Sequence, residues 1–250
     1  MPELAELRLS SDYVNEHTQN KTFTSTWKTP NHKCMEVVLP FKEFSIRTES
    51  RGKEFKMYIT GSTGEVHTLM FGFGMTGGFQ YTKRGEEPKF AHLQLYTDDG
   101  YTLSYVDPRR FGRWFWGDWK TDRSPDPTTE HKSFVTNIRQ NLNKTAFDKP
   151  IYELLMNQKY CNGIGNYLRA EILGRIDSNP FTTAREYITN NPKVLDLCKE
   201  IPEMSYKYKS KHGYYVGNEP YLKYYKNPKS LNITDKGKRV FWYDSKWGEK

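Results

Sequence analysis

The sequence contains few cysteines and no long apolar run. Cys34, Cys161 and Cys198 are the only cysteines among 250 residues. They are widely spaced and odd in number, which argues against a disulfide framework and predicts buried thiols in a reducing compartment. No stretch approaches the roughly 18 consecutive apolar residues that a membrane span needs, and the first residues are acidic, unlike a basic and apolar signal peptide. We therefore expect a soluble intracellular protein with no membrane partner.

The carboxyl-terminal part has too few ligands for a structural zinc site. No cysteine follows Cys198, and the only histidine after it is His212. A structural zinc site needs four cysteine or histidine ligands. The sequence therefore excludes a zinc site in the last part of the chain.

The charge favours a polyanionic partner. Lysine and arginine total 38 against 30 aspartate and glutamate, a net charge of +8. A basic surface attracts nucleic acid. Many basic enzymes bind no polyanion, however, so the charge alone leaves nucleic-acid binding and its absence equally open.

Residues 1–120 predict a β domain with a leading helix. Proline, an acidic first turn and spaced apolar residues predict an amphipathic helix over 2–18. From about residue 35 to 120, alternating segments such as Phe55–Ile59 and a tight turn at Asp99-Gly100 predict antiparallel strands. A β-sandwich is the simplest closure.

The remaining sequence predicts a linker, a helical domain and a hairpin. Polar, proline-marked residues 121–130 are typical of a linker. Over 131–225 the apolar spacing is helical, and residues 163–165 break it before Asn166, which we expect to cap the next helix. Over 226–250, two strand-like segments flank Asp235-Lys236-Gly237 and predict a β-hairpin. The fold class is therefore α+β.

The first residues of the chain include the best candidates for catalysis. If Met1 is removed, Pro2 presents a secondary amine with a pKa of roughly 8, so more of it is neutral at pH 7 than of a lysine. Such an amine could attack a sugar C1′ and form an iminium. Glu3 and Glu6 lie near it along the helix, and a carboxyl there could exchange protons with the sugar. Pro-Glu is also common at helix starts for structural reasons alone.

Two loops in the β region suit an opened base stack. Residues 72–78 place several glycines around Met75, which predicts a tight loop exposing a flexible apolar side chain. In residues 107–114, Arg109 and Phe111 combine a cation with an aromatic ring, as in residues that wedge between bases. Ordinary packing of an arginine on an aromatic ring explains the second loop equally well.

Two further features suit phosphate binding. The glycines of residues 162–167 allow close backbone approach just before a helix whose amino-terminal amides attract phosphate, although a plain turn has the same composition. The turn lacks the third glycine of a dinucleotide site. On the terminal hairpin, lysines and Arg239 lie beside Phe241 and Trp242, which predicts a basic and aromatic tip for a DNA groove. Exposed hairpins also carry lysines for solubility alone.

Together these motifs resemble the formamidopyrimidine-DNA glycosylase and endonuclease VIII family, and most of all the animal endonuclease VIII-like enzymes whose finger lacks zinc. The matching segments span nearly the whole chain, and in order they are Met1 to Glu3, Arg51 to Lys53, Phe73 to Gly77, Arg109 to Gly112, Asn162 to Leu173 and Arg239 to Trp242. The resemblance implies an amino-terminal β-sandwich, a helix-two-turns-helix domain and a zinc-less hairpin finger. Leu4-Ala5 replaces the family's usual Gly-Pro, which puts the first turn in doubt.

The resemblance also implies a role for each matching residue. Pro2 would be the Schiff-base nucleophile, Glu3 the proton donor to the deoxyribose and Glu6 a supporting carboxylate. The other matching residues are Lys53 and Asn166 for phosphate contact, Met75, Arg109 and Phe111 for filling the void left by an extruded base, Arg239 for gripping phosphates and assisting δ-elimination, and Lys211 in a lesion-recognition loop.

The implied activity is that of a bifunctional DNA glycosylase and abasic-site lyase. It would remove oxidised bases, pyrimidines and hydantoins in particular, from duplex, single-stranded or bubble DNA, and cut the strand by β,δ-elimination without a cofactor. We expect a nuclear monomer that meets repair or replication proteins. Two alternatives stay open: a DNA-binding paralogue that has lost catalysis, and an RNA- or ribosome-binding protein that uses the helix-two-turns-helix region alone.

Overall fold

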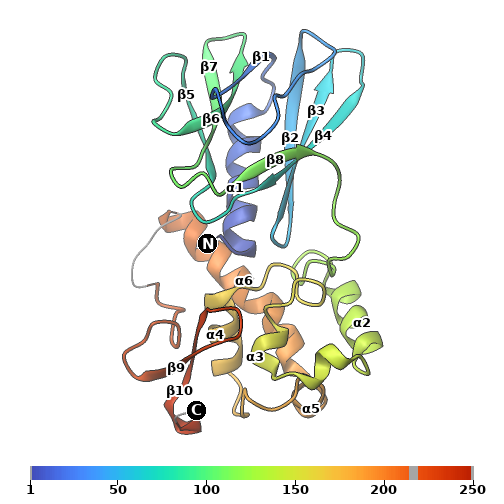
Figure 1. Cartoon of the computed structure of the whole chain (residues 1–250), viewed down its shortest axis with the longest axis vertical. Helices are drawn as coiled ribbons and strands as arrows, with labels where there is room; N and C mark the ends of the chain where they lie inside the picture. The colour runs from blue at the N-terminus through green and yellow to red at the C-terminus, as the bar shows by residue number, and fades with distance from the viewer. Residues whose placement is uncertain (1, 214–218, 249–250) are drawn as a thin grey trace. The chain divides into compact units, whose positions relative to one another are not determined.

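The computed structural model describes residues 2–213 and 219–248. The chain divides into two compact units, and the main boundary falls between Lys120 and Thr121 (Figure 1). Residues 3–5 and 51–53 belong to the second unit, although they precede that boundary. The sequence had placed both segments in the amino-terminal domain. They belong to the second unit because their backbone and side chains bond to residues 126 and 162–168, as described below.

The first unit consists of helix α1 (Leu4–Thr18) from Glu6 onward and one antiparallel sheet. The strands run in the order β5-β7-β6-β1-β2-β3-β4-β8. Their bounds are β1 Phe23–Lys28, β2 Phe44–Arg51, β3 Glu54–Gly61, β4 Val66–Gly72, β5 Gly78–Lys83, β6 Ala91–Thr97, β7 Tyr101–Val106 and β8 Arg113–Trp116. The expected turn at Gly100, whose φ is +87°, joins β6 to β7.

The sheet folds over on itself into the predicted sandwich. Strands β1 and β2 share a single residue pair, Phe23 with Phe44, so the sheet bends there. Rings then meet across the two halves: Phe55 of β3 stacks on Phe79 of β5 at 5.2 Å, and Tyr105 of β7 meets Trp114 of β8 edge to face at 5.8 Å. These contacts close one aromatic core between strands that lie far apart in the sheet order.

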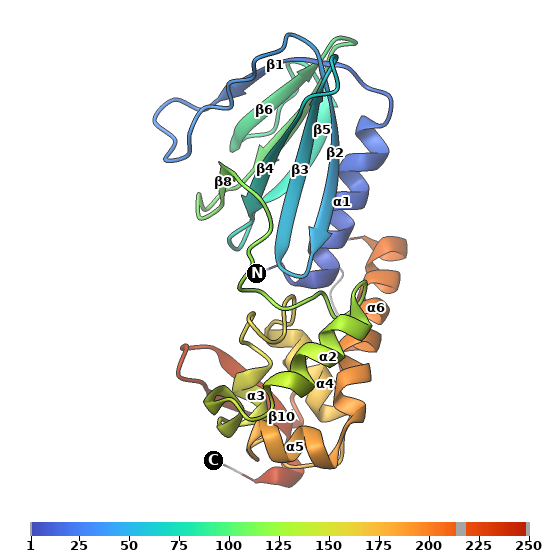
Figure 2. The ribbon, with the colours of Figure 1, turned by 90° about the vertical axis from the view of Figure 1, so that its right-hand side faces the viewer.

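Helix α1 covers strand edges that the bend leaves open (Figure 2). Asn15 donates from Nδ2 to the Thr48 carbonyl of β2 (2.9 Å) and accepts the Thr48 amide at Oδ1 (2.7 Å). The Tyr13 hydroxyl accepts the Tyr81 amide of β5 (3.0 Å). These side chains satisfy backbone groups that have no neighbouring strand. They attach the second half of the helix to β2 and β5.

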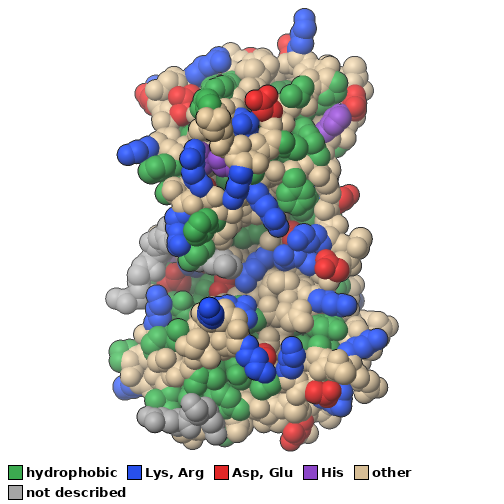
Figure 3. Space-filling view, in the orientation of Figure 1, with side chains coloured by type: hydrophobic (Ala, Val, Ile, Leu, Met, Phe, Trp, Pro, Cys, Tyr) green, Lys and Arg blue, Asp and Glu red, His purple; other side chains and the backbone are tan. Residues whose placement is uncertain are grey.

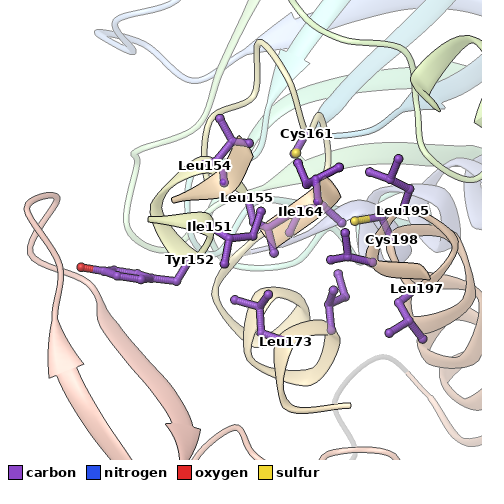
Figure 4. Packing of buried hydrophobic residues seen from close by; sticks show 14 of the residues in the cluster. Ile151, Tyr152, Leu154, Leu155, Cys161, Ile164, Leu173, Leu195, Leu197 and Cys198 are labelled. Atoms are coloured by element: carbon purple, nitrogen blue, oxygen red, sulfur yellow. The ribbon is translucent and has the colours of Figure 1, made fainter. Parts of the chain in front are cut away.

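The second unit is mainly helical, and its core is apolar (Figure 4). The expected break at residues 163–165 is confirmed, because one helix ends before it and another begins after it. The helices are α2 His131–Asn141, α3 Ile151–Leu154, α4 Asn166–Gly174, α5 Ala184–Asn190 and α6 Lys193–His212, with short 3₁₀ turns η1 Thr145–Asp148 and η2 Ser245–Trp247. Cys161 and Cys198 are buried in this core, as expected, and burial raises the pKa of the Cys161 thiol to about 12. Cys34, which was also expected to be buried, is only partly buried against the core of the first unit.

Residues 121–130, expected as a linker, pack within the second unit. Asp126 is buried, and its carboxylate accepts the amides of Gly52, Thr128 and Thr129. Glu130 binds the Arg51 guanidinium at 2.7 Å. Polar, proline-rich composition does not distinguish a free linker from a turn whose polar groups bond to one another.

The terminal hairpin forms where predicted, from β9 (Ser230–Thr234) and β10 (Val240–Asp244). Phe241, expected at its tip, is instead fully buried and stacks on Tyr152 with ring centroids 4.9 Å apart. It lies inward because side chains alternate along a strand and this face packs on the helical core. Among the described residues, no helix has the length and apolar character to cross a bilayer.

Candidate active site

Glu3 occupies the amino terminus of α4. Its carboxylate is buried and accepts the amides of Tyr167 (3.1 Å) and Leu168 (3.3 Å), 164 and 165 residues along the chain. Amides at a helix start carry partial positive charge, so they stabilise the ionised carboxylate. Gly165 makes the approach possible, because a Cβ there would lie 2.2 Å from Glu3 Cδ. The residue next to the expected nucleophile is therefore anchored in the second unit.

This arrangement corrects two expectations for the glycine turn. Asn166 does not cap α4; it is the first helical residue, and Gly165 precedes it without a side-chain cap. Two of the amides expected to bind phosphate are already bonded to Glu3. Glu3 therefore accepts the α4 amides that the local sequence assigned to Asn166 and to a bound phosphate.

Lys53 lies in the turn between β2 and β3 and bonds to the glycine turn of residues 162–165. Its Nζ donates to the Ile164 carbonyl (2.9 Å), and its amide bonds to Asn162 Oδ1 (3.2 Å). Gly52 has a φ of +59°, and a Cβ there would lie 2.3 Å from Asn162 Cγ. Only glycine fits this turn, so its backbone sets the position of the lysine.

A buried ion pair joins α4 to the hairpin. Arg169 Nη1 lies 2.8 Å from Asp235 Oδ2, and both side chains are almost fully buried. Arg169 Nη2 also donates to Asn166 Oδ1 (2.7 Å), while Asn166 Nδ2 donates to the Val240 carbonyl (2.7 Å). On the other side, Arg239 Nε reaches Asp235 Oδ2 at 3.1 Å. The sequence-predicted residues Asn166 and Arg239 are thus held by one network.

Both members of this pair are charged at neutral pH. Burial opposes the charge of Asp235, but the Arg239 amide and the Arg169 guanidinium outweigh it, so the pKa of Asp235 lies below its ordinary value. Burial lowers the pKa of Arg169, which the carboxylate partly offsets. The Asp235 carboxylate therefore supplies the charge that compensates the buried guanidinium.

The three expected void-filling residues come together in the first unit. Arg109 Nη1 lies 3.2 Å from Met75 Sδ, and its guanidinium stacks over the Phe111 ring at 4.7 Å. Met75 is 39% exposed and Phe111 is 55% exposed, although both side chains are apolar. We call Met75, Arg109 and Phe111 the wedge. It presents two apolar tips and one cation to solvent.

The remaining expected residues are Pro2, Glu6 and Lys211. Pro2 and Glu6 are buried, and Glu6 lies on α1 one turn after Pro2. Lys211, expected in a loop, is exposed in the last turn of α6, because that helix continues to His212. Residues 214–218, which follow Lys211 closely, and Met1, whose removal the chemistry requires, lie outside the described residues. Lys236 and Lys238 are exposed at the hairpin turn.

Sequence reasoning missed Arg169, Asp235 and Asp107. Arg169 and Asp235 lie 66 positions apart, so only their spacing from Asn166 and Arg239 could have indicated them. Asp107 begins the loop of residues 107–114, but nothing in the sequence indicated a role for it. In the structure its carboxylate accepts hydrogen bonds from that loop and from the loop of residues 72–78. Within residues 2–213 and 219–248, no three histidine, cysteine or acidic side chains group as metal ligands.

Comparisons with known proteins agree on one family. Residues 1–114 match the family model described as formamidopyrimidine-DNA glycosylase N-terminal domain. The chain is 34% identical to human endonuclease 8-like 1 over 97% of its own length and 72% of that protein. It is 28% identical to the formamidopyrimidine-DNA glycosylase of Vibrio atlanticus over 82% of its own length and 76% of that protein.

Solved structures share the fold along the whole chain. MutM (Fpg) from Thermus thermophilus superposes with a TM-score of 0.80 at 21% identity, covering all of both chains. Lactococcus lactis Fpg, solved with DNA containing an oxidised pyrimidine, also gives 0.80 at 21% and covers all of both chains. Figure 3 shows many lysine and arginine side chains on the visible surface, and such cations attract the phosphates of DNA.

Proposed function

This chain belongs to the formamidopyrimidine-DNA glycosylase and endonuclease VIII family, and we propose that Pro2 is its nucleophile and Glu3 its proton carrier. The protein is a DNA glycosylase and abasic-site lyase of base excision repair that acts on oxidised bases. One observation supports the assignment most directly. The Glu3 carboxylate, next to Pro2 in the chain, accepts amides from the first turn of α4, and Lys53 bonds to Ile164 in the turn just before that helix.

The chemistry follows from a free secondary amine at Pro2. Its nitrogen attacks C1′ of the damaged nucleotide, and the bond between C1′ and the base breaks with its electron pair leaving on the base. The new ammonium passes its proton to the Glu3 carboxylate. Glu3 then returns that proton to O4′ as the C1′–O4′ bond breaks and the nitrogen lone pair forms the iminium. Glu3 begins and ends as the carboxylate that the α4 amides stabilise.

The iminium then drives strand cleavage. It draws electrons from C2′, so loss of a C2′ proton expels the 3′-phosphate, and a second elimination expels the 5′-phosphate. We assign Lys53, Asn166 and Arg239 to the flanking phosphates, with Lys53 assisting the first elimination and Arg239 the second. Glu6 supports the carboxylate chemistry. No cofactor enters any of these steps.

The substrate part of the proposal is an oxidised pyrimidine or hydantoin in duplex, single-stranded or bubble DNA. The resemblance of the sequence motifs to the animal endonuclease VIII-like enzymes motivates this preference, and Lys211 remains a proposed contact near the lesion. A panel of thymine glycol, hydantoin and 8-oxoguanine oligonucleotides tests it. Faster excision of 8-oxoguanine than of the other two lesions would contradict it.

Borohydride trapping tests the nucleophile. A sample whose mass shows Pro2 as the first residue should yield a covalent DNA complex, and digestion should locate the DNA on Pro2. The same chain with Met1 retained is the matched control and should not trap, because its proline nitrogen is an amide. A Pro2→Gly variant should bind damaged DNA as before but lose incision.

The rival is a DNA-binding paralogue without catalysis, motivated by Leu4-Ala5. Damaged-DNA binding with neither trapping nor incision by the processed sample would favour it. RNA binding through the helical unit alone is tested by competition between damaged DNA and structured RNA at fixed salt.

We also propose a nuclear monomer that meets repair or replication proteins. Imaging of a tagged chain and light scattering of the purified protein test the first two points.

A further inference from the structure

Asp107 lies beneath the wedge, at the end of β7, and its side chain is only 1% exposed. One oxygen, Oδ1, accepts the Thr76 hydroxyl from the Met75 loop and the Arg109 amide (3.3 Å). The other, Oδ2, accepts the Gly112 amide (2.6 Å). A single buried carboxylate therefore bonds to both loops that carry the wedge residues.

The two loops also touch through backbone where no side chain would fit. Gly74 has a φ of +59°, and a Cβ there would lie 2.9 Å from the Gly112 nitrogen. Arg110, between the two wedge residues of its loop, has a φ of +55°, a conformation that is costly for a residue other than glycine. Surrounding bonds must hold such a backbone in place, and the Asp107 carbonyl accepts the Arg110 amide at 3.1 Å.

A third segment supports the same aspartate from behind. The His92 ring lies with Nε2 3.0 Å from the Asp107 carbonyl, and His32 stacks between His92 and Trp114. Lys33 donates to the Arg110 carbonyl (2.8 Å). The base of the wedge is thus fixed on several sides, while its tips remain exposed.

From this geometry we infer that Asp107 is a positioning residue that fixes the wedge before DNA binds and thereby favours duplex over single-stranded substrate. The inference rests on the proposed function. Filling the void beside an orphaned base is needed only in a duplex, because a single strand has no opposite base. A wedge that is ordered in advance avoids the entropy cost of ordering two loops at that moment.

An Asp107→Asn substitution should disrupt this order specifically. The amide keeps one acceptor oxygen, but its NH₂ group must then face either the Gly112 N–H or the Thr76 and Arg109 donors. In the first orientation the buried Gly112 amide loses its acceptor. In the second the Thr76 hydroxyl must accept instead of donate, and the Arg109 amide loses the carboxylate and keeps only Thr76 Oγ1, 3.4 Å away. The loops should then sample several arrangements, and the wedge should enter the stack less often.

The test uses duplexes that cannot be cut, so its result does not depend on catalysis. The probe is a tetrahydrofuran abasic analogue with 2-aminopurine opposite it, whose fluorescence rises when the stack opens, together with the same lesion strand alone. We expect Asp107→Asn to weaken duplex binding by about 10- to 100-fold, to change single-strand binding by less than about 3-fold, and to reduce the fluorescence rise. Thr76→Val, which removes one of the donors, should act in the same direction but less strongly and guards against misfolding of the first variant.

Glu87→Gln is the matched control, since its carboxylate accepts the Gly85 amide and the Thr102 hydroxyl elsewhere in the first unit. It should leave both affinities unchanged. Equal losses on duplex and single strand by the Asp107 and Thr76 variants would overturn the inference, as would unchanged duplex binding or a wild-type protein without a fluorescence rise. Failure to trap or incise would instead count against the proposed function and leave these binding results standing.

Discussion

The two units hold their candidate DNA-contacting residues in opposite ways. In the first unit the functional side chains are exposed and the groups beneath them are buried: Phe111 is 55% exposed above an Asp107 that is 1% exposed. In the second unit, buried charges belong to the candidate site or bond directly to its residues. Glu3 is 3% exposed, and Arg169, which is 0% exposed, bonds to Asn166 and shares Asp235 with the exposed Arg239. The exposed wedge side chains therefore contribute little to the stability of the fold, whereas Glu3 and Asn166 both stabilise the fold and belong to the candidate site.

The largest effect is expected from breaking the network of the second unit. Asp235→Ala leaves the buried Arg169 guanidinium without its carboxylate and should lower the free energy of unfolding by about 3–5 kcal/mol. Denaturant unfolding measures it. Lys246 pairs with Asp177 and Asp244, so Asp177→Ala, at an exposed ion pair, is the control and should cost less than about 1 kcal/mol. Similar losses for both variants would show that burial does not distinguish this network.

Glu3→Gln tests whether one residue serves both duties. Incision should fall by about 10²- to 10⁴-fold, because an amide cannot carry the proton between Pro2 and O4′. The melting temperature should also fall, since the helix start loses a charged acceptor worth roughly 1 kcal/mol. Single-turnover incision and thermal melting measure the two effects. Glu16→Gln on the exposed face of α1 should change neither, and an active Glu3→Gln protein would refute the assignment.

His32 provides a pH test of the support beneath the wedge. Burial, followed by the charges of His92, Arg110, Lys33 and Lys28, lowers the pKa of His32 from 6.5 to about 4. The unfolded chain therefore takes up its proton first as the pH falls. Stability should be complete above pH 6.5 and decline between 6.5 and 4, by at most about 3 kcal/mol.

Urea unfolding at several pH values checks this decline. His32→Phe keeps an aromatic ring in the stack but has no proton to bind, so its curve should be flatter over the same range. An equally steep curve in this variant would assign the pH dependence to other groups.

The smallest effect is expected at the exposed tip. Phe111→Ala should leave the free energy of unfolding within about 0.5 kcal/mol, because the ring is mostly in solvent. Duplex binding should weaken by about 10-fold through loss of stacking on bases, with little change for single strands. Fluorescence titration with both substrates measures it. Marked destabilisation would contradict the separation of folding and function in the first unit.

Local patterns predicted the elements and loops well. The strand around Phe55, the break before α4 and the terminal hairpin were all expected, because each depends on side-chain periodicity or turn residues within about ten positions. The association of Met75, Arg109 and Phe111 in one cluster followed from the family resemblance and is present in the structure. Their roles on DNA remain proposals.

Errors arose where a distant segment competed with local preference. Asparagine is a common helix cap, so Asn166 was expected to accept the first amides of α4. The Glu3 carboxylate accepts two of them instead, because a charged acceptor binds them more strongly than a neutral one. Phe241 looked exposed beside lysines, but the sheet alternation turns it into the core. Residues 121–130 looked like a linker because their bonds to residues 51 and 52 cannot be read from the local sequence.

The sequence by itself determined the helix and strand types, the absence of four zinc ligands after Cys198 and the motifs that identify the family, since these depend on residue identity and short spacing. Only the tertiary structure decided that Glu3 caps α4, that Arg169 and Asp235 join that helix to the hairpin, and that Asp107 holds both wedge loops. These contacts require buried charges to find partners. Which partner lies within reach is a property of the folded chain.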